Sequence, residues 1–255
     1  MRVTILQRDI VWANHELNIS RADEAIDNNA GADLYILPEM FSTGFCTSPE
    51  GIAEAADGSK SLEWLKAKAA QTNAAMACSV AVEQQGRYYN RFYFVKPDGS
   101  VASYDKHHLF TFGGEHNHFS AGEQRVIVEW RGVRILLEVC YDLRFPVWSR
   151  NRGDYDMIIS VASWPTPRVE AWKALLVARA IENQCYVAGV NRVGEDPTCQ
   201  YCGGSRIIDP YGKIIATCAD STECEASATI DMASLEAFRE KFPVLSDADS
   251  FTANF

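Results

Sequence analysis

The sequence contains no long hydrophobic run. A helix that crosses a bilayer needs about 20 consecutive apolar residues, and charged residues interrupt every apolar segment of this chain well before that length. Charges also break up the segment Met1–Asp9, which therefore lacks the apolar centre of a secretory signal. We expect a cytoplasmic protein without a membrane partner.

Basic residues are also scarce. The chain has 24 lysine and arginine residues against 34 aspartate and glutamate residues, which gives a formal net charge of −10. Nucleic-acid binding needs a basic face that neutralises phosphates, and the cations here are scattered along the sequence. The composition argues against a nucleic-acid partner and leaves a small-molecule ligand open.

A regular cysteine pattern is missing as well. Eight cysteines lie at irregular spacings in a chain of 255 residues, unlike the dense disulfide framework of a small secreted domain. We therefore expect reduced thiols. Cys199 and Cys202 form one C-x-x-C without a second pair, which is weak evidence for zinc and favours a structural or incidental role. The thiols leave one alternative class open, a thiol redox or binding protein.

The histidines do not form a recognisable metal site. Four of the five lie close together in the sequence: His107, His108, His116 and His118. Adjacent histidines rarely bind one ion without supporting carboxylates. We expect no metal ion and no other cofactor.

What the chain does contain is an alternation of short apolar runs and amphipathic stretches, typical of an α/β protein. We expect strands over Val3–Gln7, Leu34–Leu37, Ala75–Val82, Tyr88–Val95, Val126–Trp130, Val133–Val139, Met157–Ala162, Tyr186–Asn191, Arg206–Asp209, Lys213–Ala216 and Ala226–Ile230. We expect helices over Asn14–Asn29, Ser61–Thr72, Val169–Gln184 and Met232–Lys241. Proline and glycine predict hairpin turns at Lys96–Gly99 and Asp209–Gly212.

So many strands do not fit one open sheet with helices between them. Two packed sheets with outer helices are the better solution. No repeat, low-complexity tract or long linker interrupts the order, and 47% of the residues are hydrophobic, enough for one large core. We expect a single domain over residues 1–255.

Three polar residues stand at the ends of apolar runs. Cys140 follows Ile135–Val139, which is the usual setting of an exposed nucleophile at a strand end. Glu39 comes shortly after Leu34–Leu37, and Lys106 has a similar position. A cysteine alone is more often inert packing, so the combination of thiol, base and cation carries the argument.

These three residue types suit covalent hydrolysis of an amide. A thiol with a pKa of about 8.5 is mostly protonated at neutral pH, so a carboxylate such as Glu39 must take its proton. Lys106 and the backbone N–H of Tyr141 are placed to stabilise the oxyanion that forms on attack. The protonated Glu39 then gives its proton to the departing amine and later activates water. One carboxylate serves both half-reactions.

The segments around Glu39, Lys106 and Cys140 resemble the nitrilase superfamily, the carbon–nitrogen hydrolases. The catalytic glutamate, lysine and cysteine of that family follow one another in the same order. Glu115 resembles the second glutamate of the family, and Ala178–Gln184 resembles the helix after the nucleophile strand. The resemblance implies a four-layer α-β-β-α sandwich, with two mixed sheets packed face to face and helices outside. It also implies that Glu115 holds Lys106 or the substrate amide.

Within the superfamily the chain is most similar to the omega-amidase branch. The matching stretches are Leu37–Phe45, Cys140–Asn151 and Ala162–Arg168. The resemblance implies hydrolysis of the terminal amide of short 2-oxo dicarboxylate monoamides, 2-oxoglutaramate or 2-oxosuccinamate. Because the three catalytic residue types do not distinguish amides from nitriles or carbamoyl groups, a nitrilase, carbamoylase or aliphatic amidase remains an alternative.

Glu138 departs from the family pattern, which more often has an apolar residue or proline there. It lies two residues before the nucleophile and therefore on the same face of the strand. Its carboxylate either alters the ionisation of the thiol or points into a polar pocket, and the sequence does not choose between the two.

Substrate recognition is expected to involve aromatic residues and one arginine. Candidates for the pocket wall, each also a possible core residue, are Phe45, Phe119, Tyr141 and Trp164. A guanidinium fork matches the two oxygens of a carboxylate. Arg144 is the first candidate for such a clamp and Arg168 the second, although Arg144 has the alternative of pairing with Asp142.

The resemblance also implies a homodimer. The end of the chain carries the aromatic residues Phe251 and Phe255. A terminus with apolar anchors docks either on a neighbouring subunit or on its own domain, and both remain open here.

Overall fold

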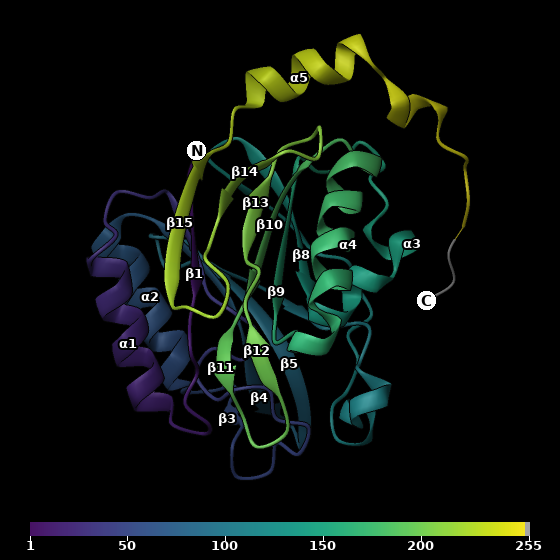
Figure 1. Ribbon diagram of the computed structural model, residues 1–255. Coiled ribbons are helices and arrows are strands. Elements are labelled where there is room, and N and C mark those ends of the chain that lie inside the picture. The colour runs from purple at the N-terminus through teal and green to yellow at the C-terminus, as the bar shows by residue number, and fades with distance from the viewer. Residues whose placement is uncertain (253–255) are drawn as a thin grey trace.

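The computed structural model describes residues 1–252. Two β-sheets pack face to face, and helices cover the outer face of each sheet (Figure 1). The chain therefore forms the four layers of an α-β-β-α sandwich, as the sequence predicts.

The bounds of the elements follow the sheet order. The first sheet contains β15 (Cys224–Thr229), β1 (Arg2–Gln7), β2 (Leu34–Ile36), β4 (Ala75–Gln84), β5 (Arg87–Val95) and β6 (Val101–Asp105), with β3 (Glu54–Ala55) beside β4. The second contains β14 (Ile214–Thr217), β13 (Arg206–Ile208), β10 (Tyr186–Asn191), β9 (Met157–Ala162), β8 (Val133–Val139) and β7 (Ile127–Trp130). A separate hairpin consists of β11 (Val193–Glu195) and β12 (Gln200–Cys202). The helices are α1 (His15–Asp27), α2 (Lys60–Thr72), α3 (Pro146–Ser149), α4 (Val169–Glu182) and α5 (Met232–Lys241).

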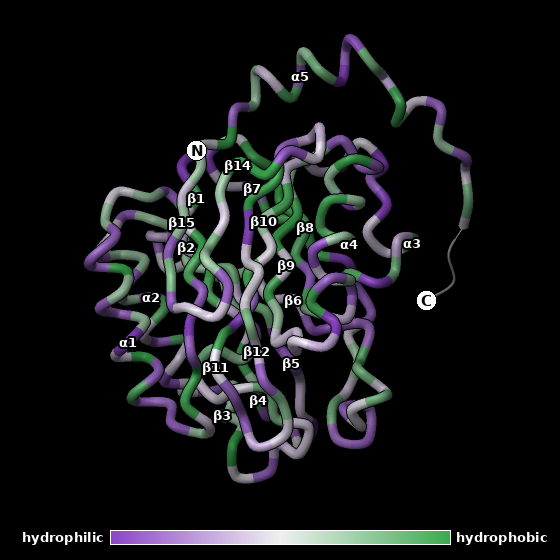
Figure 2. The backbone as a smooth tube through the Cα atoms, viewed as in Figure 1, coloured by the Kyte–Doolittle hydropathy of each residue, from purple (hydrophilic) through white to green (hydrophobic). Residues whose placement is uncertain are grey.

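Apolar side chains fill all three spaces between the layers. Alternate residues of the central strands, such as Ile36 and Val161, pack between the two sheets. Leu65 of α2 packs on the outer face of the first sheet, and Trp172 and Leu176 of α4 pack on the second. Parallel strands that are buried on both faces read as continuous apolar runs, which explains why all of β9 is buried. Figure 2 shows these hydrophobic strands gathered in the middle of the molecule.

The topology brings several strand ends to one place. Strands β2 and β4 are parallel in the first sheet, and β8, β9 and β10 are parallel in the second. In open α/β sheets, ligands bind beyond the carboxyl ends of such strands. Glu39, Cys140 and Ser163 follow the carboxyl ends of β2, β8 and β9, and Lys106 follows β6.

The predicted helices and both hairpin turns are confirmed. Gly99 accepts the left-handed conformation at φ 82° and donates its N–H to the carbonyl of Lys96 at 2.9 Å. The prediction missed β3, β6, β11, β12 and α3. These elements are short or lie at edges, so their residues are only partly buried and show no clear hydrophobic period.

The C-terminal segment crosses one end of the sandwich and returns along the side of α3 (Figure 1). It contacts its own chain, because Arg239 Nη1 donates to Asp156 at 2.7 Å and the guanidinium of Arg152 lies 5.2 Å from the centre of the Phe251 ring. The sequence left open whether the chain end docks on a neighbouring subunit or on its own domain. In the structure, Phe251 packs on its own domain. Phe255 lies outside the described residues. Within residues 1–252, no helix has the length and apolar character needed to span a bilayer.

Candidate active site

Cys140 stands at the turn that follows β8. Its backbone has φ +49°, a left-handed conformation that costs a residue with a side chain about 1–2 kcal/mol. The short 3₁₀ turn Cys140–Arg144 is held by the carboxylate of Asp142, whose Oδ2 accepts from the N–H of Val139 at 3.0 Å and from the hydroxyl of Tyr104 at 2.7 Å. This sharp strand-to-turn geometry presents the thiol at the end of the strand.

The carboxylate of Glu39 is fully buried and accepts three hydrogen bonds. Its Oε1 accepts from Lys106 Nζ at 3.0 Å and from Asn90 Nδ2 at 2.7 Å, and its Oε2 accepts from the backbone N–H of Ser163 at 2.8 Å. The charge of Glu39 acts on the thiol of Cys140 and raises its pKa. Base and thiol are therefore adjacent although they come from different sheets.

Lys106 joins Glu39 to Glu115. Its Nζ lies 3.1 Å from Oε1 and 2.9 Å from Oε2 of Glu115, and neither side chain is exposed. Glu115 is fixed in turn by the backbone N–H of Phe110 at 2.6 Å and by Asn90 Nδ2 at 3.2 Å. One cation between two carboxylates leaves a group whose formal charge is −1 when the thiol is neutral.

The electrostatics of this group keep Lys106 charged and Cys140 neutral. Burial lowers the pKa of Lys106, but the charges of Glu115 and Glu39 outweigh burial, so the net pKa is raised. Burial, followed by the charge of Glu39, raises the pKa of the Cys140 thiol well above its usual value. Lys106 and the backbone N–H of Ser163 lower that pKa, but by less. A thiol must lose its proton when it attacks, and the carboxylate of Glu39 is a group that can accept that proton.

Cys140 opens into a cavity of about 370 Å³. Of the residues predicted for the site, Cys140, Phe45, Tyr141, Arg144 and Trp164 line it. The remaining lining residues come from four loops and the β11–β12 hairpin: Trp12, Thr47, Ser48, Phe110, Phe112, Gly113, Ser163, Pro165, Arg168, Pro197, Thr198, Cys199 and Tyr201.

Phe119 does not line this cavity. Only 4% of it is exposed, and it packs with Met40, Cys46 and Ala81. Its backbone N–H donates to the carbonyl of Glu115 at 2.9 Å. The structure therefore places Phe119 behind the loop that carries Glu115, which corrects the predicted place of Phe119 in the pocket wall.

Arg144 does not pair with Asp142. The oxygens of Asp142 accept from Tyr104, from Val139 and from the backbone N–H of His108. The guanidinium of Arg144 lies 4.7 Å from the centre of the Trp164 ring and has no hydrogen bond or ion pair to any of residues 1–252. Its charge is therefore available to a ligand in the cavity.

Sequence reasoning missed two groups that hold Glu39, the side chain of Asn90 and the backbone N–H of Ser163. The signal for Asn90 was an amide residue within a strand rich in aromatic residues, and the structure buries it. A backbone donor such as that of Ser163 has no signal in the sequence, since every residue except proline carries one.

Glu138 points away from the thiol, toward α3 and α4. Its Oε1 accepts from Ser149 Oγ at 2.6 Å, and burial raises its pKa to about 7. Of the two alternatives, the polar pocket is the one observed. Arg179 of α4 faces the same pocket and also donates to the carbonyl of Leu143 in the nucleophile turn at 2.5 Å.

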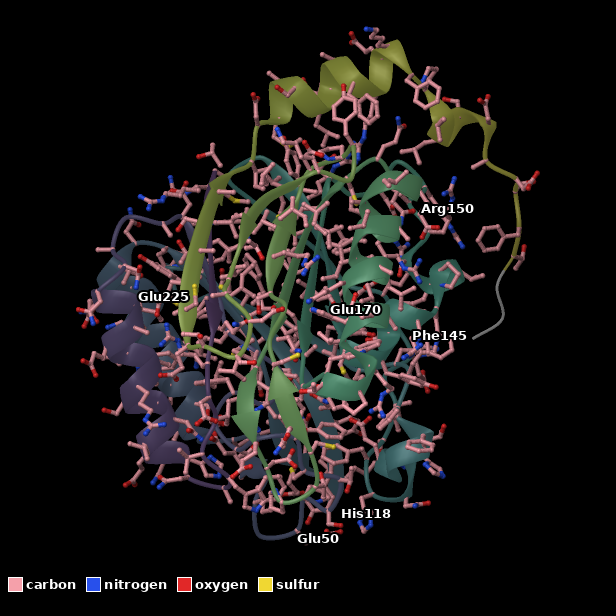
Figure 3. All side chains as sticks on the ribbon, in the orientation of Figure 1. Glu50, His118, Phe145, Arg150, Glu170 and Glu225 are labelled. Atoms are coloured by element: carbon pink, nitrogen blue, oxygen red, sulfur yellow. The ribbon has the colours of Figure 1, made fainter. Side chains whose placement is uncertain are left out.

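The histidines make separate contacts. His107 and His108 bond to the carbonyl of Gly122 and to Asp142, at 2.6 and 2.8 Å. His118 and Glu50 point toward one another at one end of the molecule, 2.9 Å apart (Figure 3). Within residues 1–252, no three histidine, cysteine, aspartate or glutamate side chains are grouped as metal ligands, and all eight cysteines are free.

A carbon-nitrogen hydrolase model matches residues 2–240. The chain is 50% identical over 252 residues to omega-amidase YafV of Escherichia coli (strain K12), and 98% of both chains is covered. It is 37% identical over 251 residues to 2-oxoglutaramate amidase of Bacillus subtilis (strain 168), with 96% of both chains covered. The crystal structure of XC1258 from Xanthomonas campestris, a CN-hydrolase superfamily protein with an arsenic adduct in its active site, superposes with a TM-score of 0.96. That protein is 41% identical, and the match covers 100% of this chain and 99% of XC1258.

The chain therefore belongs to the carbon-nitrogen hydrolase family, the nitrilase superfamily, and its similarity places it with the omega-amidases. It is an enzyme that hydrolyses a bond between carbon and nitrogen in an amide.

Proposed function

We propose that this enzyme hydrolyses the terminal amide of short 2-oxo dicarboxylate monoamides, with 2-oxoglutaramate and 2-oxosuccinamate as substrates. The products are the dicarboxylic acid and ammonia. The observation that carries the proposal is the Glu39–Lys106 ion pair, whose charges act on the Cys140 thiol, beside a cavity whose arginines lack a hydrogen-bonded or ionic partner for their side chains within residues 1–252. Relatives described as an omega-amidase and a 2-oxoglutaramate amidase support the choice of substrate.

The first half-reaction forms a thioester. As the Cys140 sulfur attacks the amide carbon, its proton passes to Glu39. Lys106 and the backbone N–H of Tyr141 stabilise the negative charge on the carbonyl oxygen, each strong donor contributing about 3–4 kcal/mol. The tetrahedral intermediate collapses when protonated Glu39 gives its proton to the nitrogen, and ammonia leaves.

The second half-reaction uses the same base. Glu39, again a carboxylate, takes a proton from water, which attacks the thioester carbon. The thiolate leaves and recovers the proton from Glu39. Because Ser163 and Asn90 hold Glu39 by hydrogen bonds independent of the thiol, the carboxylate keeps its place through both steps.

Glu115 positions Lys106 in this scheme. The Glu115 carboxylate takes two contacts from the ammonium, and its negative charge raises the pKa of Lys106. Lys106 therefore remains a cation through the cycle, as oxyanion stabilisation requires.

Arg144 binds the substrate carboxylate remote from the scissile amide. Its position four residues after the nucleophile and its lack of an acidic partner in the described part of the chain support this role. Stacking on Trp164 fixes the plane of the guanidinium and leaves its N–H groups free. Phe45, Tyr141 and Trp164 supply the apolar wall along the carbon chain.

Ammonia release tests the proposed substrate class. The protein is incubated with 2-oxoglutaramate, 2-oxosuccinamate, a short aliphatic amide, a nitrile and a carbamoyl compound. We expect the two 2-oxo amides to have the highest kcat/KM. No ammonia from either of them, with turnover of another compound, moves the enzyme to a different branch of the superfamily.

The thiol redox alternative makes a different prediction. It requires a reversible disulfide, such as one between Cys199 and Cys202, that controls function without dependence on Glu39 or Lys106. A mass-spectrometric map of iodoacetamide labelling separates the two accounts. The hydrolase account predicts that Cys140 reacts first and that substrate suppresses its labelling, whereas an inert Cys140 supports the redox account.

We further propose that the enzyme acts as a homodimer of single-domain subunits in the cytoplasm. A nucleophilic thiol must stay reduced to function, which favours a reducing compartment. Exposed apolar side chains near the C-terminal segment, Tyr211 and Phe242 among them, support a subunit interface there.

A further inference from the structure

The cavity contains a second guanidinium that pairs with no acidic side chain of residues 1–252. Arg168 ends the short turn Thr166–Arg168 after β9 and is half-buried in the cavity wall. Like Arg144, it has no side-chain hydrogen bond and no ion pair to residues 1–252. An uncompensated cation in a largely apolar wall is costly unless a ligand supplies the missing charge.

Trp164 fixes the positions of both arginines. Arg144 lies over its ring, and its indole N–H donates to the backbone carbonyl of Arg168 at 2.8 Å. Trp164 is itself held by Asn191, which accepts from its backbone N–H at 2.7 Å and donates to its carbonyl at 2.9 Å. Trp164 therefore contacts the guanidinium of Arg144 and holds the backbone of Arg168.

Two phenylalanines contact the guanidinium of Arg168. It lies 5.3 Å from the centre of the Phe110 ring and 5.9 Å from that of Phe112. Phe112 is 85% exposed, so it contributes little to the core, and its ring contacts Phe110 as well as Arg168. Aromatic faces hold a guanidinium without using its N–H donors, which stay free for an anion.

We propose that Arg168 is the second cation of a two-arginine clamp and binds the substrate carboxylate together with Arg144. This inference rests on the proposed function and adds a specificity-determining residue to it. A carboxylate has two oxygens with about four acceptor sites, enough for two guanidinium groups. The clamp makes the enzyme select for amides that end in a carboxylate, whatever their remaining structure.

The clamp is also connected to the catalytic end of the site. The backbone N–H of Phe110 donates to Glu115, and Glu115 holds Lys106. One loop therefore carries both the aromatic support of Arg168 and the carboxylate that positions the oxyanion cation.

Three substrates of similar length separate recognition of the carboxylate from chemistry. 2-Oxoglutaramate has both a carboxylate and an oxo group, glutaramate has the carboxylate alone, and pentanamide has neither. Charge-assisted bonds to a carboxylate contribute enough that Arg168→Ala should lower kcat/KM for the first two by roughly 10- to 100-fold. Turnover of pentanamide should change less than about threefold, and Arg168→Lys should recover part of the loss.

Arg152→Ala is the matched control, because Arg152 is also an arginine over a phenylalanine ring but is exposed and does not line the cavity. Added guanidinium ion should restore activity to Arg168→Ala and have no such effect on the control. In Arg144→Ala/Arg168→Ala, the loss should be smaller than the product of the single losses, since both residues hold one carboxylate.

Calorimetric titration of 2-oxoglutarate gives a readout besides turnover. The Arg168 variants should bind this product more weakly by the same factor as their loss of kcat/KM. Equal losses on all three substrates, or unchanged binding of 2-oxoglutarate, would overturn the clamp. A different outcome is that the unsubstituted enzyme does not hydrolyse 2-oxoglutaramate, yet has a higher kcat/KM for glutaramate than for pentanamide that Arg168→Ala removes. In that case the proposed substrate is wrong and the clamp is supported.

Discussion

At Cys140, burial and the charge of Glu39 act on the thiol in the same direction. Both raise its pKa, and the nearby Lys106 does not reverse the effect. A cysteine beside a histidinium is held as a thiolate, but the thiol of Cys140 is not. Because the thiol stays neutral, we expect its proton to pass to Glu39 as the sulfur attacks the carbonyl carbon.

Substitution of Cys140 should remove turnover while leaving the fold intact. We expect Cys140→Ala to have no measurable ammonia release, and Cys140→Ser to lose nearly all of it because a hydroxyl is a far poorer nucleophile with this base. Glu39→Gln should lose both proton transfers, and Lys106→Ala should lose oxyanion stabilisation. Circular dichroism checks folding, and substantial activity in folded Cys140→Ala excludes the covalent mechanism.

Glu138 should make stability fall as pH rises. Burial raises its pKa from 4.5 to about 7, so the folded protein binds this proton more tightly than the unfolded chain does. The contribution of this proton to the free energy of unfolding is fully present below pH 4.5 and is lost between that pH and about 7. The loss is about 3 kcal/mol by linkage. Glu138→Gln should remove this slope and be the more stable protein at pH 8.

Urea unfolding at pH 5, 6, 7 and 8 measures the effect of Glu138→Gln. Glu129→Gln is the control, because Glu129 is an exposed glutamate on the neighbouring strand β7. A slope that persists unchanged in Glu138→Gln would assign the pH dependence to another group.

At the scale of the element, the turn after β8 begins with a residue in a left-handed conformation. Its left-handed cysteine is held in place by the carboxylate of Asp142, which ties the turn to β8 through Val139 and to β6 through Tyr104. Helix α4 contributes Arg179, which bonds to the carbonyl of Leu143 from the other side. The nucleophile is thus positioned by three elements at once.

Asp142→Asn should loosen this turn. An amide nitrogen in place of one carboxylate oxygen meets N–H and O–H donors, which leaves a buried donor unsatisfied at a cost of about 1–3 kcal/mol. We expect a lower free energy of unfolding and a lower kcat, measured by urea titration and ammonia release. Asp98→Asn in the exposed β5–β6 turn should change neither by a comparable amount. An unchanged kcat in Asp142→Asn would mean that the turn keeps its shape without this carboxylate.

The sequence revealed the parts of the site that lie directly after apolar runs. Glu39 and Cys140 follow strands, and this position is visible without coordinates. The roles of Asn90, Ser163 and Phe110 were not visible in the sequence. Ser163 and Phe110 contribute backbone N–H groups. Asn90 contacts Glu39, which lies far from it in the sequence. Phe119 was misplaced because an aromatic residue near a loop looks the same in sequence whether it faces the cavity or the core.

The layers of the whole molecule were predictable for a similar reason. Strands buried on both faces and helices with one apolar face leave few arrangements other than packed sheets with outer helices. The edge strand β6 and the hairpin β11–β12 were not predictable, since their hydrogen bonds depend on partners supplied by the fold. That hairpin contributes one wall of the cavity.

We predict that the protein is a homodimer in solution. The C-terminal segment leaves large apolar side chains exposed, Phe242 at 57% and Phe251 at 42%, and burial of such surface in a subunit interface is favourable. Analytical ultracentrifugation at micromolar concentration should give the mass of two chains. A monomer alone under these conditions excludes the proposed dimer.

The account depends most on a thioester between Cys140 and the substrate, and the mass of the protein during turnover tests this directly. Samples mixed with 2-oxoglutaramate are quenched in acid and measured intact and after digestion. We predict an acyl adduct on the Cys140 peptide that forms together with a burst of ammonia and decays as substrate is exhausted, and no adduct in Cys140→Ala. Steady ammonia release by the unsubstituted enzyme without any adduct, together with activity in Cys140→Ala, would contradict the account.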